Sequence, residues 1–313
     1  MLAVRSPSEM KILLIHNPNA GIGEHSDEKL TRLLAKVGDV TYRSVKSKRW
    51  MTAFDEEPAD LIVAAGGDGT VRKVALHAPR GSRMAIVPLG TANNVARSLG
   101  ISGRPKDVVA SWKSARWQPL DLGYALGPWG ERPFLEGVGI GAVTRTAAQM
   151  DTGEPESDGS SPIKQARKLL QAVLANGSSS WFDVSVDGQS ISERAVLLEI
   201  ANIPYIGPRL ALAPMADPGD GELDIVWLPE DGRKDLRDWL ADASAEDNEA
   251  PVRICRGSRI QIHHATGQFR IDDQYWPPQP DPEHADTTSD IDISVIGGAL
   301  SVLVPQGSPE RPR

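Results

Sequence analysis

The chain has 313 residues, which is enough to bury one large hydrophobic core or two modest ones, and two is the expected number. Its 42 acidic residues outnumber 34 basic ones, giving a formal net charge of -8. Because no long Lys/Arg stripe offsets this charge, we do not expect the protein to bind nucleic acid. Any bound phosphate must be held locally, by backbone amides, helix N-termini, a few basic side chains or a metal.

Cys255 is the only cysteine, so neither a disulfide within the chain nor a cysteine zinc cluster is expected. Residues 1–10 lack the apolar run of a signal peptide, and no stretch of about 18 apolar residues occurs to form a transmembrane segment. We therefore expect a cytoplasmic protein that touches a membrane, if at all, as a peripheral protein at its inner surface. A homodimer is left open.

Predicted strands and helices alternate over residues 1–120. Strands are expected at 11–16, 40–45, 60–65 and 84–88, and helices at 26–37, 50–54, 70–77 and 92–99. This alternation predicts a three-layer α/β domain whose parallel sheet is covered on both faces.

The pattern changes to alternating strands and glycine-rich turns over residues 121–298, which predicts a β-rich, sandwich-like second domain. Strands are expected at 134–140, 181–186, 196–201, 223–228, 258–263, 268–271 and 291–295, with one helix at 163–174. The segments 152–161 and 274–290 read as surface loops, and the tail after Pro305 as disordered. A last strand within 299–305 could return to the first domain.

The first chemical signal is Gly66-Gly67-Asp68-Gly69-Thr70, between a predicted strand and a helix. Glycines let the backbone turn sharply beside a ligand, and the helix behind them points amide hydrogens at an anion. Asp68 would repel a bound phosphate unless a metal ion or a proton lay between them. The plainer alternative is a tight turn in which Asp68 caps a helix.

Two further polar turns follow predicted strands, at Asn17-Pro18-Asn19-Ala20-Gly21 and at Pro88-Leu89-Gly90-Thr91-Ala92-Asn93. Thr91 and Asn93 suit either phosphate binding or helix capping. The carboxyl ends of parallel strands are where open α/β folds place ligands, so the three turns together predict a nucleotide site. Neither a Walker P-loop nor the dinucleotide glycine pattern is present.

The second domain holds two acidic segments of interest. Asp217-Pro218-Gly219-Asp220-Gly221-Glu222 has the oxygen spacing of a hard-cation loop, or is an acidic turn before a strand. Arg270-Ile271-Asp272-Asp273-Gln274 reads as a strand that ends in an acidic turn, or as a site for a catalytic carboxylate.

The three turns resemble the nucleotide-site motifs of the diacylglycerol kinase catalytic family, which includes sphingosine kinases and bacterial lipid kinases. The resemblance continues through Asp121-Leu122-Gly123, 137–142 and Asp220-Gly221-Glu222-Leu223. It implies a two-domain protein with ATP in the interdomain cleft, Mg²⁺ as cofactor and a lipid pocket in the β-rich domain.

The resemblance also assigns roles to individual residues. Asp272 is the implied general base and Asp68 the implied partner of catalytic Mg²⁺, while Asp217, Asp220 and Glu222 would bind a structural Mg²⁺. The implied nucleotide-binding residues are Asn17, Gly66, Gly67, Asp68, Gly69, Thr70, Val71, Arg72, Gly90, Thr91 and Asn93.

The chain departs from the family at several of these positions. Arg72-Lys73 replaces a usual Asn-Glu pair, Glu136 stands where Asn is common, and Asp273-Gln274 replaces Gly-Glu. Gln274 cannot supply the negative charge of the glutamate.

Three hypotheses follow from these residues. The first is an ATP-dependent lipid kinase acting on diacylglycerol or a related lipid alcohol at a membrane surface. The second is a kinase of a soluble acceptor, because NAD kinases share the Gly-Gly-Asp-Gly turn. The third is a nucleotide-binding regulatory protein with weak catalysis. The helix at 163–174, with Lys164, Arg167 and Lys168 beside its apolar face, would either contact lipid headgroups or pack on its own sheet.

Overall fold

The structure is a computed structural model that describes residues 10–21, 25–152, 161–207, 209–242, 249–278 and 288–306. The chain divides into two compact units, the first made of residues 1–121 and 297–313, the second of residues 122–296. The strands β5 and β16 each contribute residues to both units. Within the described segments, no helix is long and apolar enough to cross a membrane.

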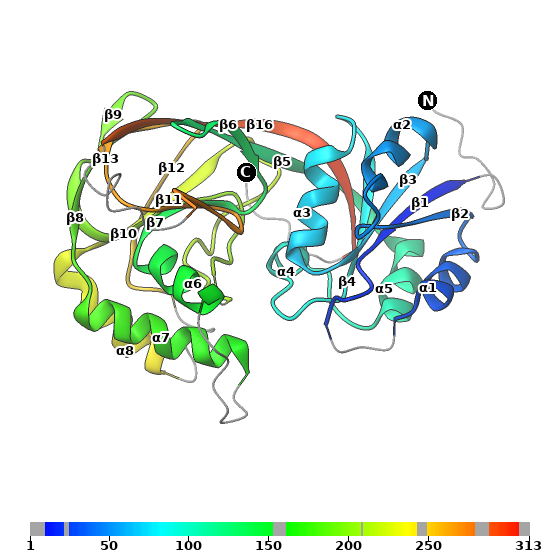
Figure 1. Ribbon diagram of the computed structural model, residues 1–313, viewed down its shortest axis with the longest axis horizontal. Coiled ribbons are helices and arrows are strands. Elements are labelled where there is room, and N and C mark those ends of the chain that lie inside the picture. The colour runs from blue at the N-terminus through cyan, green and yellow to red at the C-terminus, as the bar shows by residue number, and fades with distance from the viewer. Residues whose placement is uncertain are drawn as a thin grey trace. The chain divides into compact units, whose positions relative to one another are not determined.

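The first unit is built on a parallel sheet with the strand order β4-β3-β1-β2 (Figure 1). Ser301 and Val302 of β16 add a further parallel pairing beside β4. The elements are β1 Lys11–His16, α1 Asp27–Leu34, β2 Asp39–Ser44, η2 Trp50–Thr52, α2 Ala53–Glu56, β3 Leu61–Gly66, α3 Asp68–His77, β4 Arg83–Pro88, α4 Asn94–Ser98, α5 Pro105–Ser111 and η3 Trp112–Ser114.

Both faces of this sheet are covered, as the sequence predicts. Alternate strand residues such as Ile12 and Val63 pack with Leu30 and Leu34 of α1 and Val109 of α5. The strand residues between them are buried as well, and α2 and α3 lie on the other side of the sheet (Figure 1). Strands buried on both faces read as continuous apolar runs, which is why they are recognisable in the sequence.

The second unit is β-rich and almost entirely antiparallel. Its pairing runs β15-β14-β7-β10-β8-β13-β16, and β11 pairs with both β10 and β12. The elements are β5 Arg116–Gly127, β6 Gly130–Phe134, β7 Gly137–Gly141, α6 Ala142–Thr152, α7 Pro162–Asn176, β8 Ser180–Val186, β9 Gln189–Ser190, β10 Glu193–Ala201, β11 Leu223–Pro229, η4 Glu230–Gly232, α8 Arg233–Ala241, β12 Arg253–Gly257, β13 Arg259–Ala265, β14 Phe269–Ile271, β15 Gln274–Trp276 and β16 Ser289–Val304.

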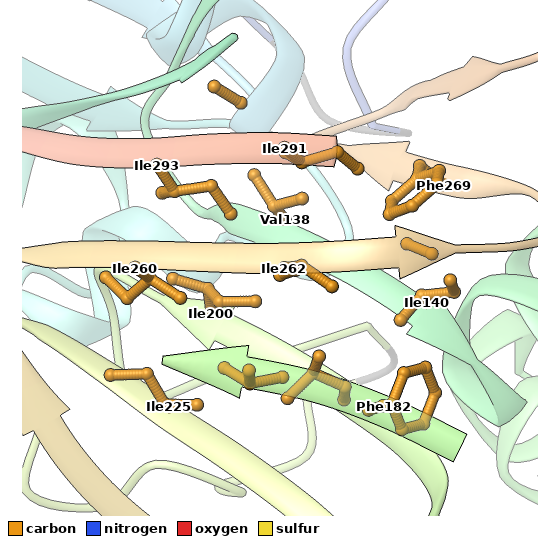
Figure 2. Close-up of a cluster of buried hydrophobic side chains, with 14 of the residues drawn as sticks. Val138, Ile140, Phe182, Ile200, Ile225, Ile260, Ile262, Phe269, Ile291 and Ile293 are labelled. Carbon is orange, nitrogen blue, oxygen red and sulfur yellow. The ribbon is translucent and has the colours of Figure 1, made fainter. Parts of the chain in front are cut away.

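Two hydrophobic clusters hold this unit together. In the first, Ile260 and Ile262 of β13 and Ile293 of β16 meet Val138 of β7 and Ile200 of β10 (Figure 2). In the second, the helices α6, α7 and α8 pack on the opposite side of β10 and β11. The fold class predicted from the sequence, an α/β domain followed by a β-rich one, is confirmed.

The apolar face of α7 belongs to the second cluster. Leu170, Val173 and Leu174 are buried against the unit's own strands. This is the plainer of the two alternatives for the helix, so its apolar face is not available to a lipid.

Several predicted elements need correction. The second unit contains α6 and α8 in addition to α7, whereas the sequence predicts one helix. The strand expected at 134–140 is interrupted at Leu135 and Glu136, where the backbone amides turn to the Asp272 carboxylate instead of a neighbouring strand. The strands expected at 291–295 and 300–304 are one strand, β16. The loop expected at 274–290 begins with a strand, β15, and most of its remainder lies outside the described residues. The loop expected at 152–161 and the tail expected after Pro305 also fall largely outside them.

Candidate functional site

The three polar turns of the first unit touch one another at the carboxyl ends of β1, β3 and β4. A Cβ on Gly21 would lie 2.2 Å from the carbonyl oxygen of Leu89, and one on Gly90 would lie 2.5 Å from the Cα of Gly67. Both distances are too short for any side chain, so the turns can approach this closely only as glycines. The structure therefore brings together turns whose contacting residues, Gly21 with Leu89 and Gly67 with Gly90, are far apart in the sequence.

Hydrogen bonds fix the turns to the strand ends. The amide of Asn17 donates to the carbonyl of Ala65 over 2.9 Å, and the amide of Leu89 donates to the carbonyl of Gly66 over 2.9 Å. The turn at Gly66 is further confined by Thr70, whose side chain leaves no room for a Cβ at that glycine. The result is a backbone-lined edge at the N-terminus of α3, where amide hydrogens suit an anion.

Asp68 begins α3, but its carboxylate binds the start of another helix. The amide of Val95 in α4 donates to Asp68 Oδ1 over 3.0 Å. Burial raises the pKa of Asp68, while hydrogen bonds from the backbone amides of Val95, Asn94 and Asn93 act in the opposite direction. Asp68 thus links the turn from Gly66 to Thr70 to α4, the helix that follows the Gly90 turn.

The asparagines of the turns also have structural partners. Asn93 has a left-handed backbone, φ 50°, and its side chain both accepts from the amide of Gly90 at 2.9 Å and donates to the carbonyl of Gly90 at 2.7 Å. Asn17 accepts from the amide of Asn19 at 3.1 Å. Both side chains shape the turns, whereas the neighbouring Thr91 is exposed at the surface.

The remaining predicted nucleotide-binding residues differ in accessibility. Gly67 and Gly69 are partly exposed, whereas Thr70, Val71 and Arg72 are buried in α3. The amide of Val71 already donates to the carbonyl of Gly67 over 3.1 Å, so Val71 and Arg72 belong to the body of α3 and not to its open N-terminal edge.

A histidine pair at the end of β1 was not predicted from the sequence as part of the site. Nε2 of the fully buried His16 lies 3.1 Å from Nδ1 of His25. Nδ1 of His16 lies 3.4 Å from the Tyr42 hydroxyl. Burial, reinforced by His25, lowers the pKa of His16 to about 4, so the ring stays neutral at neutral pH. Its position at the last residue of a strand, next to Asn17, was the available signal.

A cavity of about 670 Å³ in the first unit borders the turn that contains Pro88, Leu89 and Gly90. Apolar side chains of α1, including Leu30 and Leu33, line it together with Leu89 and Gly90. It is also lined by five cationic residues, Lys29, Arg32, Lys36, Arg104 and Lys106. Positive charge is therefore concentrated around this cavity in an otherwise acidic chain, and one of the cations, Arg104, pairs with Asp107.

Asp272 lies in the second unit and is 3% exposed. Its Oδ2 accepts from the amide of Leu135 at 2.9 Å, and its Oδ1 accepts from the amides of Glu136 at 2.8 Å and Gly137 at 3.1 Å. Its backbone is left-handed, φ 52°. Three amide hydrogens stabilise the ionised carboxylate, so Asp272 holds the break between β6 and β7.

A buried ion pair between Arg270 and Glu199 is hydrogen-bonded to the backbone of Asp272. Arg270, 7% exposed, donates to Glu199 Oε2 at 2.7 Å and to the carbonyl of Asp272 at 2.8 Å. Burial raises the pKa of Glu199 to about 7, and the attraction of Arg270 only partly offsets this. Of the two residues that follow Asp272, Asp273 is exposed and Gln274 accepts from Arg132 at 3.2 Å.

The acidic segment of the second unit does not form an open cation loop. Arg256 of β12 lies among its carboxylates and contacts Asp220, Glu222 and Asp224. In the described parts of the chain, no three Asp, Glu, His or Cys side chains converge as metal ligands. The residues present therefore do not fit the structural Mg²⁺ that the resemblance implies.

Solved structures share this two-unit fold. A diacylglycerol kinase of Bacillus anthracis matches with a TM-score of 0.64 and 21% identity, covering 96% of this chain and 98% of that one. An NAD kinase of Archaeoglobus fulgidus, solved with ATP, matches with a TM-score of 0.50 and 12% identity over 96% of this chain and 95% of that one. The fold is that of the diacylglycerol kinase and NAD kinase group.

Sequence comparison narrows the assignment. Residues 11–125 match the diacylglycerol kinase catalytic domain, and residues 160–304 match the YegS C-terminal NAD kinase beta sandwich-like domain. The chain therefore combines a diacylglycerol kinase catalytic domain with a YegS C-terminal domain.

The curated relatives include proteins named as kinases. A Pseudomonas putida protein named probable lipid kinase YegS-like is 33% identical over 54% of this chain and 55% of its own length. The Bacillus subtilis diacylglycerol kinase is 28% identical over 84% of this chain and 89% of its own length. The chain spans about half the length of the Pseudomonas relatives that it matches.

Proposed function

We propose that the protein is an ATP-dependent lipid kinase that transfers the γ-phosphate of ATP to the hydroxyl of diacylglycerol or a related lipid alcohol. The observation that carries this proposal is the mutual contact of the three glycine turns in the first unit. Such an edge of amide hydrogens at strand ends suits a polyphosphate.

Nucleotide binding is assigned to the first unit. The turn from Gly66 to Thr70 would hold the phosphates at the N-terminus of α3, and Val71 and Arg72 would support it from within the helix. Gly90 and Thr91 would contact the nucleotide from the turn that follows β4. Asn17 and Asn93 would act by shaping the turns, as their hydrogen bonds indicate. The cations beside Gly90 would attract the anionic nucleotide.

Mg²⁺ bound with ATP would neutralise the phosphate oxygens, as phosphoryl transfer requires. Asp68 is the candidate ligand for this Mg²⁺, because it lies within the turn from Gly66 to Thr70. Its hydrogen bond from Val95 fixes the carboxylate and would hold it in one orientation towards the nucleotide.

The acceptor chemistry is assigned to the second unit. The lipid hydroxyl would lose its proton to Asp272 while its oxygen forms a bond to the γ-phosphorus, and the bond to the β–γ bridging oxygen breaks as ADP leaves. The amides of Leu135, Glu136 and Gly137 would keep Asp272 ionised and in position. The protein would act on lipid at a membrane surface, as a peripheral protein.

The proposal is tested by replacing Asp68 with Ala and measuring transfer of labelled phosphate from Mg-ATP to extracted bacterial lipids. We expect loss of product by about 100-fold or more, because the carboxylate proposed to hold the Mg²⁺ of Mg-ATP is removed. Asp107→Ala, which removes an exposed carboxylate paired with Arg104, is the matched control and should retain activity. Undiminished turnover by Asp68→Ala would reject the proposal.

Two alternatives rest on specific observations. A soluble acceptor is favoured by the match of residues 160–304 to an NAD kinase-like domain, and phosphorylation of NAD in place of lipid would establish it. A regulatory nucleotide-binding role is favoured by the three amides already bound to Asp272 and by Gln274. ATP binding without turnover on either acceptor would support that role.

A further inference from the structure

The acidic segment before β11 concentrates negative charge in a small space. Asp217, Asp220, Glu222 and Asp224 fall within eight residues, and Asp224 is 1% exposed. Like charges at this spacing repel one another, and a buried carboxylate is costly unless hydrogen bonds or a cation compensate for its lost hydration. A cation beside the segment would offset both effects.

The pairing of β11 with β12 brings one cation to this place. Arg256 is the direct antiparallel partner of Asp224. Its guanidinium contacts Asp220, lies 3.2 Å from Glu222 and 3.6 Å from Asp224. These carboxylates raise the pKa of Arg256.

The aspartates of the turn use their oxygens within the protein. Asp217 Oδ1 accepts from the amide of Gly219 at 3.1 Å, and Asp220 Oδ1 accepts from the amide of Glu222 at 3.0 Å. Asp220 Oδ2 binds Arg256. Both oxygens of Asp220 are thus engaged, and the adjacent guanidinium would repel a divalent cation at this carboxylate.

We infer that Arg256 is a built-in counter-ion that replaces the divalent cation at this turn, so that the second unit keeps its acidic turn in shape without a metal. A guanidinium is always charged and presents five donors in a planar fork, which lets one side chain serve several carboxylates. The inference concerns the folded second unit and does not depend on the proposed kinase activity.

The first test uses the unmodified chain without nucleotide. We expect its melting temperature to be the same in EDTA and in millimolar Ca²⁺ or Mg²⁺, and calorimetric titration with Ca²⁺ to give no saturable heat. A saturable Ca²⁺ or Mg²⁺ response that Asp220→Asn removes would overturn the inference.

The second test restores a metal site by removing the guanidinium. Arg256→Gln should melt lower in EDTA and gain a saturable rise of about 3 °C or more with Ca²⁺. The double variant Arg256→Gln with Asp220→Asn should lose that gain. Arg253→Gln is the matched control, because Arg253 lies on the same strand but pairs with Glu193, away from the turn.

A second substitution guards against misfolding of the glutamine variant. Arg256→Lys keeps the charge but contacts fewer carboxylates, so it should show a smaller Ca²⁺ response than Arg256→Gln. If folded Arg256→Gln and Arg256→Lys respond to Ca²⁺ no more than Arg253→Gln does, the acidic turn has no cation site for Arg256 to replace and the inference is wrong.

Discussion

At the scale of single residues, the close contact between two of the glycine turns depends on the absence of side chains at Gly67 and Gly90. Gly67 and Gly90 come from different turns, and their backbones touch where side chains would otherwise stand. A Cβ on Gly90 would be 2.5 Å from the Cα of Gly67, while one on Gly67 would be 3.2 Å from the Cα of Gly90. The two positions therefore tolerate a methyl group to different degrees, because the shorter contact requires a backbone shift.

Gly90→Ala should weaken ATP binding strongly and lower the free energy of unfolding by about 1–3 kcal/mol, as overpacking does. Gly67→Ala should have the smaller effect on both quantities. Titration calorimetry with ATP and denaturant unfolding measure them. Gly81→Ala is the control: it has φ +79° but open space around the Cβ, so it carries backbone strain without affecting the turns. Equal ATP affinity of Gly90→Ala and the unmodified chain would contradict the close-contact interpretation.

At the scale of elements, the pair Glu199–Arg270 joins β10 to β14 across β7. Glu199 is 1% exposed, and its Oε1 has no hydrogen-bond partner in the described structure. Arg270 is the better satisfied member, since it also donates to the carbonyl of Asp272. Arg270 therefore helps to position Asp272 through its carbonyl. The free-energy cost of the pair is mainly the desolvation of the Glu199 carboxylate.

This cost predicts a pH dependence of stability. The folded pKa of Glu199, about 7, exceeds its ordinary value of 4.5. The folded protein therefore holds a proton that the unfolded chain releases, and stability is lost as pH rises from 4.5 to 7. The unmodified chain should lose up to about 3 kcal/mol of its free energy of unfolding over this range, and Glu199→Gln should not show this loss. Urea unfolding from pH 4.5 to 8 measures the difference, and parallel curves for both proteins would contradict it.

At the scale of the whole molecule, the proposed function assigns separate tasks to the two units. The glycine turns and the cationic cavity belong to residues of the first unit, whereas Asp272 and its amides belong to the second. Nucleotide binding should therefore survive changes at Asp272 that remove acceptor chemistry.

Asp272→Asn should lower the melting temperature, because three hydrogen bonds to a charged acceptor become weaker. It should nevertheless keep the stabilisation by ATP, about 2.7 kcal/mol at 100 times the dissociation constant. Thermal melts with and without Mg-ATP measure both effects. If the variant loses the ATP response while remaining folded, the separation of tasks is wrong.

Much of the first unit could be predicted from its sequence because both sides of its strands are buried. The mostly apolar runs 11–16 and 60–65 indicate buried strands, and Asn17-Pro18 and Gly66-Gly67 mark where they end. Helices α6 and α8 were missed for the opposite reason. α8 shows Leu236, Trp239 and Leu240 at helical spacing, but it is short and otherwise polar, so the pattern is weak without the sheet that it covers.

The sequence by itself determined the local chemistry of this protein: three glycine turns at strand ends, an acidic turn before β11, and an aspartate after β14. Those features depend on short-range backbone geometry, which neighbouring residues encode. Only the tertiary structure decided their partners. Gly67 meets Gly90, Asp68 binds Val95, Asp272 binds the amides at Leu135 to Gly137, and Arg256 enters the acidic turn. Each of these contacts joins residues more than 20 positions apart, and chain folding, which has no local signature in the sequence, brings them together.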